Sequence, residues 1–298
     1  MHGAGRYAPS PSGDLHLGNL RTALLAWLFA RSEGRNFLLR IEDLDRVQPG
    51  AADRQMADLS AIGLDWDGPV VRQSERLDHY RHAVRELVDQ GRTFECFCTR
   101  REVQEAVSAP HAPLGAYPGT CRNLTGAQRA ERRRTRLPTL RLRTDVAEFT
   151  ITDVLAGRYT GLVDDFVLNR GDGVPAYNLT VVVDDAEQRI GQVVRGEDLL
   201  ASTPRQAYLG TLLGLSIPAY AHVPLAVNTE GRRLAKRDGA VTMAALATLG
   251  WTPHRLLALL ATSLQLAEPG EMVSAGQLIP RFDAHSIPRQ PWTVERHR

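Results

Sequence analysis

The stretch that decides the fold is Arg6-Tyr7-Ala8-Pro9-Ser10-Pro11-Ser12-Gly13-Asp14-Leu15-His16-Leu17-Gly18-Asn19, which runs directly into an apolar segment, Leu20 to Arg31. We predict a short strand from Gly5 to Ala8, followed by a loop rich in proline, serine and glycine. A helix is expected to begin near Asn19, because apolar side chains at positions 20, 24, 27 and 28 recur with helical spacing. The pattern is that of a loop leading into a helix N-terminus.

The start of this helix is a candidate phosphate site. Backbone N–H groups are unpaired there and the helix dipole is positive, so anions bind readily. Gly18 allows a phosphate to approach the backbone, and His16 can donate a hydrogen bond without a permanent buried charge. The alternative interpretation is a capped core helix beside an incidental histidine, because a lone H-x-G motif is short.

A basic segment far downstream, Arg232-Arg233-Leu234-Ala235-Lys236-Arg237, contains the only lysine among the 36 Lys and Arg residues of the chain. An ammonium group on a flexible stem can follow a phosphate through a reaction better than a planar guanidinium can. Lys236 is therefore a candidate catalytic residue, and chance survival on a solvated loop is the alternative.

Together, the P-S-P-S-G-x-L-H-x-G loop and the R-L-A-K-R segment resemble the HIGH and KMSKS signatures of the class I aminoacyl-tRNA synthetases. The phrase Arg40-Ile41-Glu42-Asp43-Leu44-Asp45 narrows the resemblance to the glutamyl branch. The matching motifs extend from Arg6 to Arg237, and the chain most resembles the shortened members that act on queuosine in tRNA(Asp). The chain departs from the general signatures in two places. Asn19 stands where the first signature has its second histidine, and the basic segment lacks the first lysine and both serines of the second signature.

The composition suits one large or two modest globular domains, since 298 residues, 43% of them apolar, can form a sizeable core. A net charge of +2 means that any nucleic-acid surface must be local. We find no secretory signal and no run of about eighteen apolar residues, so we expect a cytoplasmic protein without a membrane partner. We also expect a monomer.

A second strand is predicted from Phe37 to Asp43, which makes a βαβ unit with the first strand and helix. Ligands bind at the carboxyl ends of the strands in such folds, and Glu42 falls at that end. Glu42 could hold a substrate ammonium or pair with a neighbouring arginine. Two further helices are predicted from Pro49 to Leu64 and from Glu75 to Gln90.

All three cysteines, Cys96, Cys98 and Cys121, fall within 26 positions. Such clustering in a cytoplasmic chain favours one structural zinc ion over a disulfide, and three buried thiols are the alternative. By residue type, His111 is the better fourth ligand, because imidazole is a commoner zinc ligand than phenolate. The resemblance instead implies Tyr117, because related synthetases carry C-x-C followed by Y-x₃-C.

A cluster of arginines follows the cysteines, at positions 122, 129, 132, 133, 134, 136, 141 and 143. It could bind RNA phosphates or form a solvated helix face. Short strands and turns are predicted from Phe149 to Asp172, and apolar runs that end in charge then recur at 176–185 and 190–194, as in the first half. The nucleotide-binding fold is thus predicted to be split by an insertion.

The resemblance implies an α/β fold: a Rossmann-type class I synthetase catalytic domain with an inserted acceptor-side subdomain. Its first half would span residues 1–94 and its second half, with the KMSKS-like loop, residues 173–243. The inserted acceptor-type domain with the zinc site would span 95–172. Residues 244–298 would form a short helical C-terminal region, with no anticodon-binding domain.

The resemblance also assigns roles within the site. It implies a glutamate site formed by Arg6, Tyr7, Ala8, Pro9, Ser10, Glu42, Tyr177 and Arg195. It implies an ATP site, with Mg²⁺ on the phosphates, formed by His16, Gly18, Asn19 and Lys236, of which His16 and Lys236 would be catalytic.

The implied reaction has two steps. Glutamate reacts with ATP, without tRNA, to give glutamyl-adenylate and pyrophosphate, and a queuosine hydroxyl in the anticodon loop of tRNA(Asp) then takes the glutamyl group. The alternatives are a minimal glutamyl-tRNA synthetase acting on tRNA(Glu), a small-molecule nucleotidylyltransferase with an H-x-G-H loop, and a catalytically inactive paralogue that binds RNA or amino acid.

Overall fold

A seven-stranded sheet forms the body of the protein in the computed structural model, which describes residues 3–107, 116–232, 234 and 241–294. The strands lie in the order β3-β2-β1-β9-β10-β6-β7. In that order their bounds are Val71–Arg72, Phe37–Ile41, Ala4–Tyr7, Ile190–Gly196, Ala219–Val223, Glu148–Asp153 and Gly157–Leu162. Neighbouring strands run parallel, except for the antiparallel pair β6 and β7. The predicted α/β class is confirmed, with a mixed sheet.

The strand order reverses between β1 and β9. The first half of the chain builds outward from β1 through β2 to β3, and the second half builds from β9 to β10 on the other side. In doubly wound sheets, ligands bind beyond the carboxyl ends of the strands at such a reversal. Here those ends are Tyr7 and Gly196.

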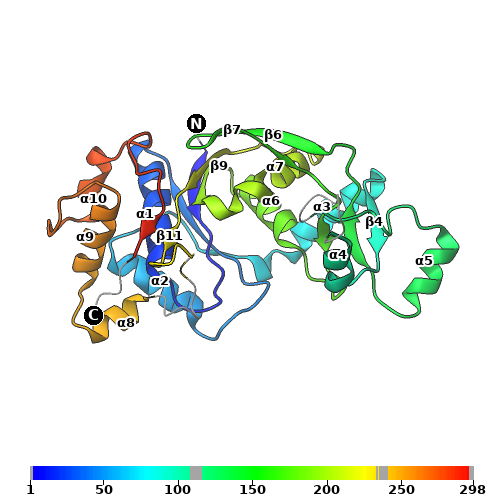
Figure 1. Ribbon diagram of the computed structural model, residues 1–298, viewed down its shortest axis with the longest axis horizontal. Helices are drawn as coiled ribbons and strands as arrows, with labels where there is room; N and C mark the ends of the chain where they lie inside the picture. The colour runs from blue at the N-terminus through cyan, green and yellow to red at the C-terminus, as the bar shows by residue number, and fades with distance from the viewer. Residues whose placement is uncertain (1–2, 108–115, 233, 235–240, 295–298) are drawn as a thin grey trace.

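Helices cover the sheet, and two hydrophobic clusters separate the protein into a part around α1 and a part around α6 (Figure 1). The helices associated with the main sheet are α1 Leu17–Ser32, α2 Ala51–Ala61, α3 Leu77–Asp89, α6 Tyr177–Glu187 and α7 Thr203–Leu212. The C-terminal region contributes α8 Met243–Thr248, α9 Pro253–Ser263 and α10 Ala275–Leu278. Short elements are η1 Gln73–Glu75, η2 Glu197–Ser202, η4 Ile279–Arg281, β11 Ala226–Val227 and β12 Trp292–Thr293.

Helix α1 is buried on nearly all sides, not only along the predicted apolar stripe. Of its 16 residues, 11 are buried, because α9 packs against its outer side in the same hydrophobic cluster. Its buried Arg21 donates to the Pro224 carbonyl at 2.9 Å and to the Ser263 hydroxyl at 3.1 Å. The C-terminal helices are therefore integral to the hydrophobic core around α1.

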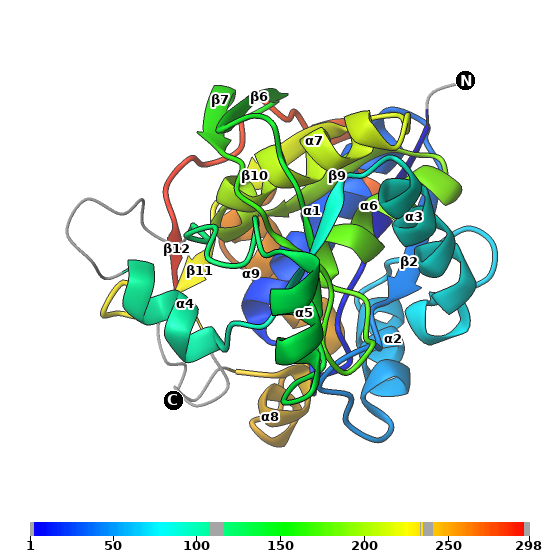
Figure 2. The ribbon, with the colours of Figure 1, turned by 90° about the vertical axis from the view of Figure 1, so that its right-hand side faces the viewer.

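A three-stranded antiparallel sheet lies at one end of the long axis. It consists of β4 Thr93–Cys96, β5 Thr139–Leu142 and β8 Val167–Asn169, and it carries α4 Arg100–Val107 and α5 Gly126–Arg133. Figure 2, which looks along the molecule from this end, shows α4 and α5 in front of the main sheet. A separate hydrophobic cluster, built around the cysteines, stabilises this part.

In two stretches of the chain, the structure differs from the strand-helix-strand pattern of the first half. The apolar run 176–185 forms α6, because Leu179 and Val183 pack against Tyr208 and Leu209 on neighbouring α7. Strands β6 and β7, inside the range 95–172, belong to the main sheet: β6 pairs with β10, and β7 pairs with β6 at the edge. Among the described residues, no helix combines the length and the apolar character needed to cross a membrane.

Candidate active site

One cavity of about 650 Å³ lies beyond the carboxyl ends of β1 and β9. The loop after β1, the first turn of α1 and the ends of β2 and β9 enclose it. It is lined by every described residue for which the sequence predicted a catalytic or substrate-binding role: Arg6, Tyr7, Ala8, Pro9, Ser10, His16, Gly18, Asn19, Glu42, Tyr177 and Arg195. The reversal of strand order thus brings the two halves of the predicted site together.

Helix α1 begins at Leu17 rather than near Asn19, because His16 caps it. The Nδ1 atom of His16 accepts from the backbone N–H groups of Gly18 at 3.1 Å and Asn19 at 3.3 Å. The Asn19 side chain in turn accepts from the His16 backbone N–H at 3.2 Å, which completes a capping box. Asn19 is therefore a partner within the cap, and the cap residue is His16 itself.

The cap also orients the His16 ring. Because Nδ1 accepts, the proton of the neutral ring lies on Nε2, where it can be donated to a phosphate. Gly18 is closely surrounded: an added Cβ would lie 3.1 Å from the Ala226 Cβ and 3.1 Å from the His16 ring, so these neighbours would have to shift by a few tenths of an ångström. The structure therefore combines the two interpretations of His16, as a helix cap and as a residue at the mouth of the cavity.

The opposite end of the cavity rests on a buried network of charges. Arg6 pairs with Asp185 at 3.3 Å, and Arg40 pairs with the same carboxylate at 2.8 Å. Arg40 also lies 3.5 Å from Glu42 and 3.6 Å from Asp184. Glu42 therefore does pair with a neighbouring arginine, as the alternative interpretation expected, while it also lines the cavity.

Asp184 anchors this network to the outer helices. It is fully buried and accepts hydrogen bonds from Gln73 at 2.8 Å, Arg76 at 2.6 Å and Tyr80 at 2.8 Å. Sequence analysis assigned no role to Arg40, Asp184 or Asp185. An acidic pair directly after an apolar run was the available signal, because buried carboxylates require partners.

The charges of the network balance one another. The three carboxylates of Glu42, Asp184 and Asp185 face the three guanidinium groups of Arg6, Arg40 and Arg76. Burial raises the pKa of Glu42, although Arg40 and Arg6 oppose that rise. Burial would also raise the pKa of Asp185, but Arg6 and Arg40 hold it below its usual value. Asp185 is thus firmly ionised, whereas Glu42 gains from a further positive partner.

Arg195 reaches the same cavity from β9 and has no carboxylate partner among the described residues. Its guanidinium donates to the His222 ring at 3.1 Å, to the Thr203 hydroxyl at 2.7 Å and to the Tyr177 hydroxyl at 3.3 Å. A guanidinium has five N–H donors, so two remain for a ligand. Two N–H groups on a fixed fork match the two oxygens of a carboxylate.

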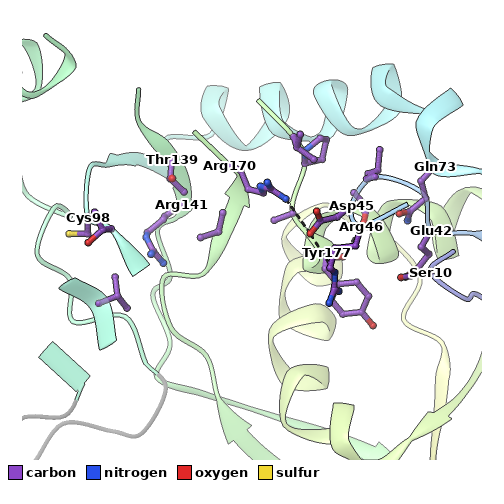
Figure 3. A pocket seen from close by; sticks show the side chains of 18 of the residues that line it. Ser10, Glu42, Asp45, Arg46, Gln73, Cys98, Thr139, Arg141, Arg170 and Tyr177 are labelled. Atoms are coloured by element: carbon purple, nitrogen blue, oxygen red, sulfur yellow. Dashed lines mark hydrogen bonds and ion pairs between the residues drawn. The ribbon is translucent and has the colours of Figure 1, made fainter. Parts of the chain in front are cut away.

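A second cavity of about 570 Å³ adjoins the first and shares Ser10, Glu42, Arg46 and Tyr177 with it. Figure 3 shows it extending from Tyr177 and Glu42 to the small sheet, where Cys98 marks its far end. Charged side chains lie along it, including an ion pair of 3.4 Å between Arg170 and Asp45. The first cavity is therefore open toward the cysteine-containing part of the molecule.

The three cysteines converge, with their sulfur atoms within 4.8 Å of one another. The Tyr117 hydroxyl lies 3.3 Å from Cys96 Sγ and 3.9 Å from Cys98 Sγ, so the structure brings it into the same group. Three sulfur atoms and a phenol oxygen at such distances fit a tetrahedral structural zinc site. The other candidate ligand, His111, lies outside the described residues.

The arginine cluster is only partly available to a partner. Arg141 lies over the Tyr117 ring at 3.8 Å, and Arg122 pairs with buried Asp165. The arginines at 132, 133, 134 and 136, at the end of α5, are exposed. Within this cluster, the exposed guanidinium groups that RNA phosphates could reach thus lie around the end of α5.

Lys236 lies outside the described residues, as do Arg233, Ala235 and Arg237. Within the same segment, Leu234 lines the catalytic cavity and donates its backbone N–H to the Ala226 carbonyl at 3.2 Å. Directly after that segment in the sequence, the Val241 carbonyl accepts the Leu17 N–H at 3.0 Å. The described flanks of the basic segment therefore border the cavity near His16.

This fold and cavity are those of a class I aminoacyl-tRNA synthetase catalytic domain. A family model described as "tRNA synthetases class I (E and Q), catalytic domain" matches residues 4–298. A curated glutamyl-Q tRNA(Asp) synthetase from Nocardia farcinica is 65% identical over 98% of this chain and 93% of its own length. Another from Cutibacterium acnes is 52% identical over 97% of this chain and 84% of its own length. The chain belongs to the glutamyl-Q tRNA(Asp) synthetase family and is a ligase-type enzyme.

Solved structures agree with this placement. A glutamate tRNA ligase from Elizabethkingia meningosepticum, solved in complex with its amino acid, is 29% identical with a TM-score of 0.83. The glutamate-tRNA synthetase from Elizabethkingia anophelis is 28% identical with a TM-score of 0.84. Both comparisons cover 99% of this chain, and they cover 67% and 68% of the respective neighbours.

Proposed function

We propose that the protein activates L-glutamate with ATP in the absence of tRNA and then transfers the glutamyl group to queuosine in the anticodon loop of tRNA(Asp). The observation that carries the proposal is that one cavity contains both features: a capped helix N-terminus at one end and, at the other end, charged side chains suited to an acidic amino acid. The names of the relatives at 65% and 52% identity support the tRNA substrate.

At the charged end, the proposed glutamate site has one acidic and two basic groups. The free N–H groups of Arg195 would bind one substrate carboxylate, with Arg6 and the backbone from Tyr7 to Ser10 beside it. Glu42 would take the α-ammonium, because its buried carboxylate gains from added positive charge. Arg195 has no direct carboxylate partner among the described residues, so its positive charge faces the site of a substrate whose net charge is −1.

At the helix end, the proposed ATP site consists of His16, Gly18, Asn19 and Lys236. The glutamate α-carboxylate oxygen attacks the α-phosphorus, the bond to the bridging oxygen breaks, and pyrophosphate leaves with its charge. The His16 Nε2–H and the helix dipole would stabilise that charge. Lys236 would follow the phosphates, and Mg²⁺ bound to ATP would neutralise them further.

In the second step, a queuosine hydroxyl attacks the carbonyl carbon of the adenylate and gives up its proton, the bond from that carbon to the phosphate oxygen breaks, and AMP leaves. The second cavity opens onto Glu42 and Tyr177, which makes it the proposed path by which the nucleoside reaches the adenylate. The exposed arginines at the tip of α5 would hold RNA phosphates nearby. The domain boundaries, a monomeric state and a cytoplasmic location stay predictions.

The proposed zinc ion would be structural, held by Cys96, Cys98, Tyr117 and Cys121. These residues come from β4, from the turn after it and from the loop before α5, so one ion would cross-link separate segments of the small domain. Cys98 also lines the second cavity, and the zinc site would thereby fix one wall of the proposed nucleoside path.

The experiment that tests the function measures transfer of labelled glutamate to purified tRNA(Asp) from cells with and without queuosine, beside tRNA(Glu). We expect label on queuosine-containing tRNA(Asp) alone. Label on tRNA(Glu) would instead identify a minimal glutamyl-tRNA synthetase. Absence of label from every tRNA, together with absence of glutamate-dependent ATP–pyrophosphate exchange, would point to an inactive RNA-binding paralogue.

A further inference from the structure

Behind Arg195 lies a buried relay of three side chains, which we call the Asp153–His222–Arg195 chain. It crosses three adjacent strands, from Asp153 on β6 through His222 on β10 to Arg195 on β9. Asp153 Oδ2 lies 2.6 Å from His222 Nδ1, and Arg195 Nε donates to His222 Nε2 at 3.1 Å. The side chains of Asp153 and His222 are fully buried, and Arg195 alone of the three lines the catalytic cavity.

We propose that His222 is a positioning residue for the amino-acid substrate. Its neutral imidazole accepts the Nε–H of Arg195 and so turns the two remaining N–H groups of the guanidinium toward the cavity. Asp153 keeps the imidazole in the tautomer that can do this. The inference rests on the proposed function, in which Arg195 binds a carboxylate of glutamate.

The directions of the hydrogen bonds fix the tautomer. Arg195 can only donate, so His222 Nε2 must accept and the ring proton must lie on Nδ1. That proton is donated to Asp153, whose Oδ1 also accepts the backbone N–H groups of Leu155 at 2.9 Å and Ala156 at 2.8 Å. Asp153 is itself held by its own turn, so it presents a fixed acceptor to the ring.

The Thr203 hydroxyl completes the arrangement. It accepts from a terminal nitrogen of Arg195 at 2.7 Å and lies 3.0 Å from His222 Nε2. Thr203 and His222 thus hold one edge of the guanidinium, and Tyr177 holds the third nitrogen. An arginine fixed at three atoms loses little rotational freedom when a carboxylate binds, which favours affinity.

The surroundings of the ring favour its neutral form. Burial lowers the pKa of His222, and the positive charges of Arg195 and Arg6 lower it further against the opposing effect of Asp153. Tyr220, on the same strand, stacks at 6.2 Å between ring centroids and adds no charge. The imidazole therefore stays neutral near pH 7, where a protonated ring would direct an N–H at a guanidinium.

The test compares three full-length variants in glutamate-dependent ATP–pyrophosphate exchange. His222→Leu removes the acceptor, and we expect the KM for glutamate to rise at least about tenfold while the KM for ATP changes less than about twofold. His222→Gln offers an amide oxygen to Arg195 and is expected to recover most of that loss. A merely structural role would raise both KM values and would not distinguish Leu from Gln.

The third variant tests the tautomer. Asp153→Asn can keep its oxygen on the backbone N–H groups of Leu155 and Ala156 and, at 3.3 Å, on that of His222. It loses the 3.1 Å bond from the His222 N–H to Oδ2 and turns an N–H toward His222 Nδ1, which moves the ring proton to Nε2. We expect the same rise in the KM for glutamate, with an unchanged melting temperature within a few degrees, and a shift of the His222 ¹⁵N resonances from the Nδ1–H to the Nε2–H pattern.

The outcomes separate the two proposals. An unchanged KM for glutamate in folded His222→Leu and Asp153→Asn, with an active unsubstituted protein, would overturn this inference alone. Absence of glutamate-dependent exchange in the unsubstituted protein would overturn the proposed function, and this inference with it.

Discussion

The two ends of the catalytic cavity are built in different ways. At the helix end, where we propose that ATP phosphates bind, His16 finds its partners two and three residues further along the chain. At the charged end, the proposed glutamate site, Arg6 bonds with Asp185, 179 positions away, and Arg40 bonds with Gln188, 148 positions away. The first end is a local motif that a short peptide segment already specifies, whereas the second exists only after the strands have been ordered.

This difference separates two kinds of functional residue. A local cap tolerates changes elsewhere in the protein, because its hydrogen bonds close within one turn of helix. A buried charge network does not, because each member depends on partners from other strands and helices. The comparison leads to two kinds of prediction. Substitutions in the network should lower the stability of the fold, whereas substitutions of the local groups should change the reaction rate or the affinity for a ligand.

The largest effect is expected from Arg40→Met, at the centre of the long-range network. The substitution leaves buried Asp184 and Asp185, and half-buried Glu42, with fewer positive partners. We expect the free energy of unfolding to fall by about 3–5 kcal/mol in urea denaturation. The matched control is Arg81→Met, which removes an exposed partner of Asp78 on α3 and is expected to leave the midpoint unchanged. Equal loss in both variants would contradict the comparison.

The next effect concerns the local end and is catalytic. Asparagine is among the best helix caps, so His16→Asn keeps an acceptor for the helix N-terminus and removes the ring N–H. We expect an unchanged melting temperature and a fall in kcat for glutamate-dependent exchange of about 10²–10³-fold. Retained activity with an unchanged melting temperature would mean that His16 only caps the helix.

The same contrast explains how much the sequence could predict. The strand-loop-helix, Glu42 at the end of β2 and the cysteine cluster follow from short spacings, and the structure brings those residues together. Asp153 and His222 belong to no motif, and they meet because β6 pairs with β10. Periodicity likewise could not show that β6 and β7 join the main sheet, since a strand's pattern does not specify its partner.

The third prediction concerns a contact whose partners are neither adjacent in the sequence nor far apart in it. Arg132, on α5, donates to Cys121 Sγ at 3.4 Å across 11 positions of sequence. Arg132→Met removes a positive partner of the proposed metal ligand, so we expect the affinity for Zn²⁺ to fall about 10–100-fold. Competition with a chelating dye measures it, and Arg134→Met, whose partner is Glu131, is the control. Equal affinity in the two variants would exclude Arg132 from the metal environment.

The smallest effect is expected where the local and long-range ends meet. Tyr177 stands at the start of α6, borders both cavities, and accepts from Arg195 at 3.3 Å. Tyr177→Phe removes that acceptor but leaves Thr203 and His222 on the guanidinium, so it should cost about 1 kcal/mol, or about a fivefold rise in the KM for glutamate. Tyr159→Phe, on β7 outside the cavity, is the control.

Tyr177→Phe also sharpens the comparison. Although the residue is partly exposed, desolvation of its hydroxyl raises the pKa of Tyr177, so the hydroxyl stays protonated across the assay range. Its contribution should therefore be independent of pH between about 6 and 9. If the ratio of the two KM values changed with pH in that window, an ionising group would have to act through the hydroxyl. A constant ratio would mean that Tyr177 acts only as an uncharged hydrogen-bond acceptor. The Arg195 guanidinium would then be positioned chiefly by His222 and Thr203, side chains that only the folded sheet brings together.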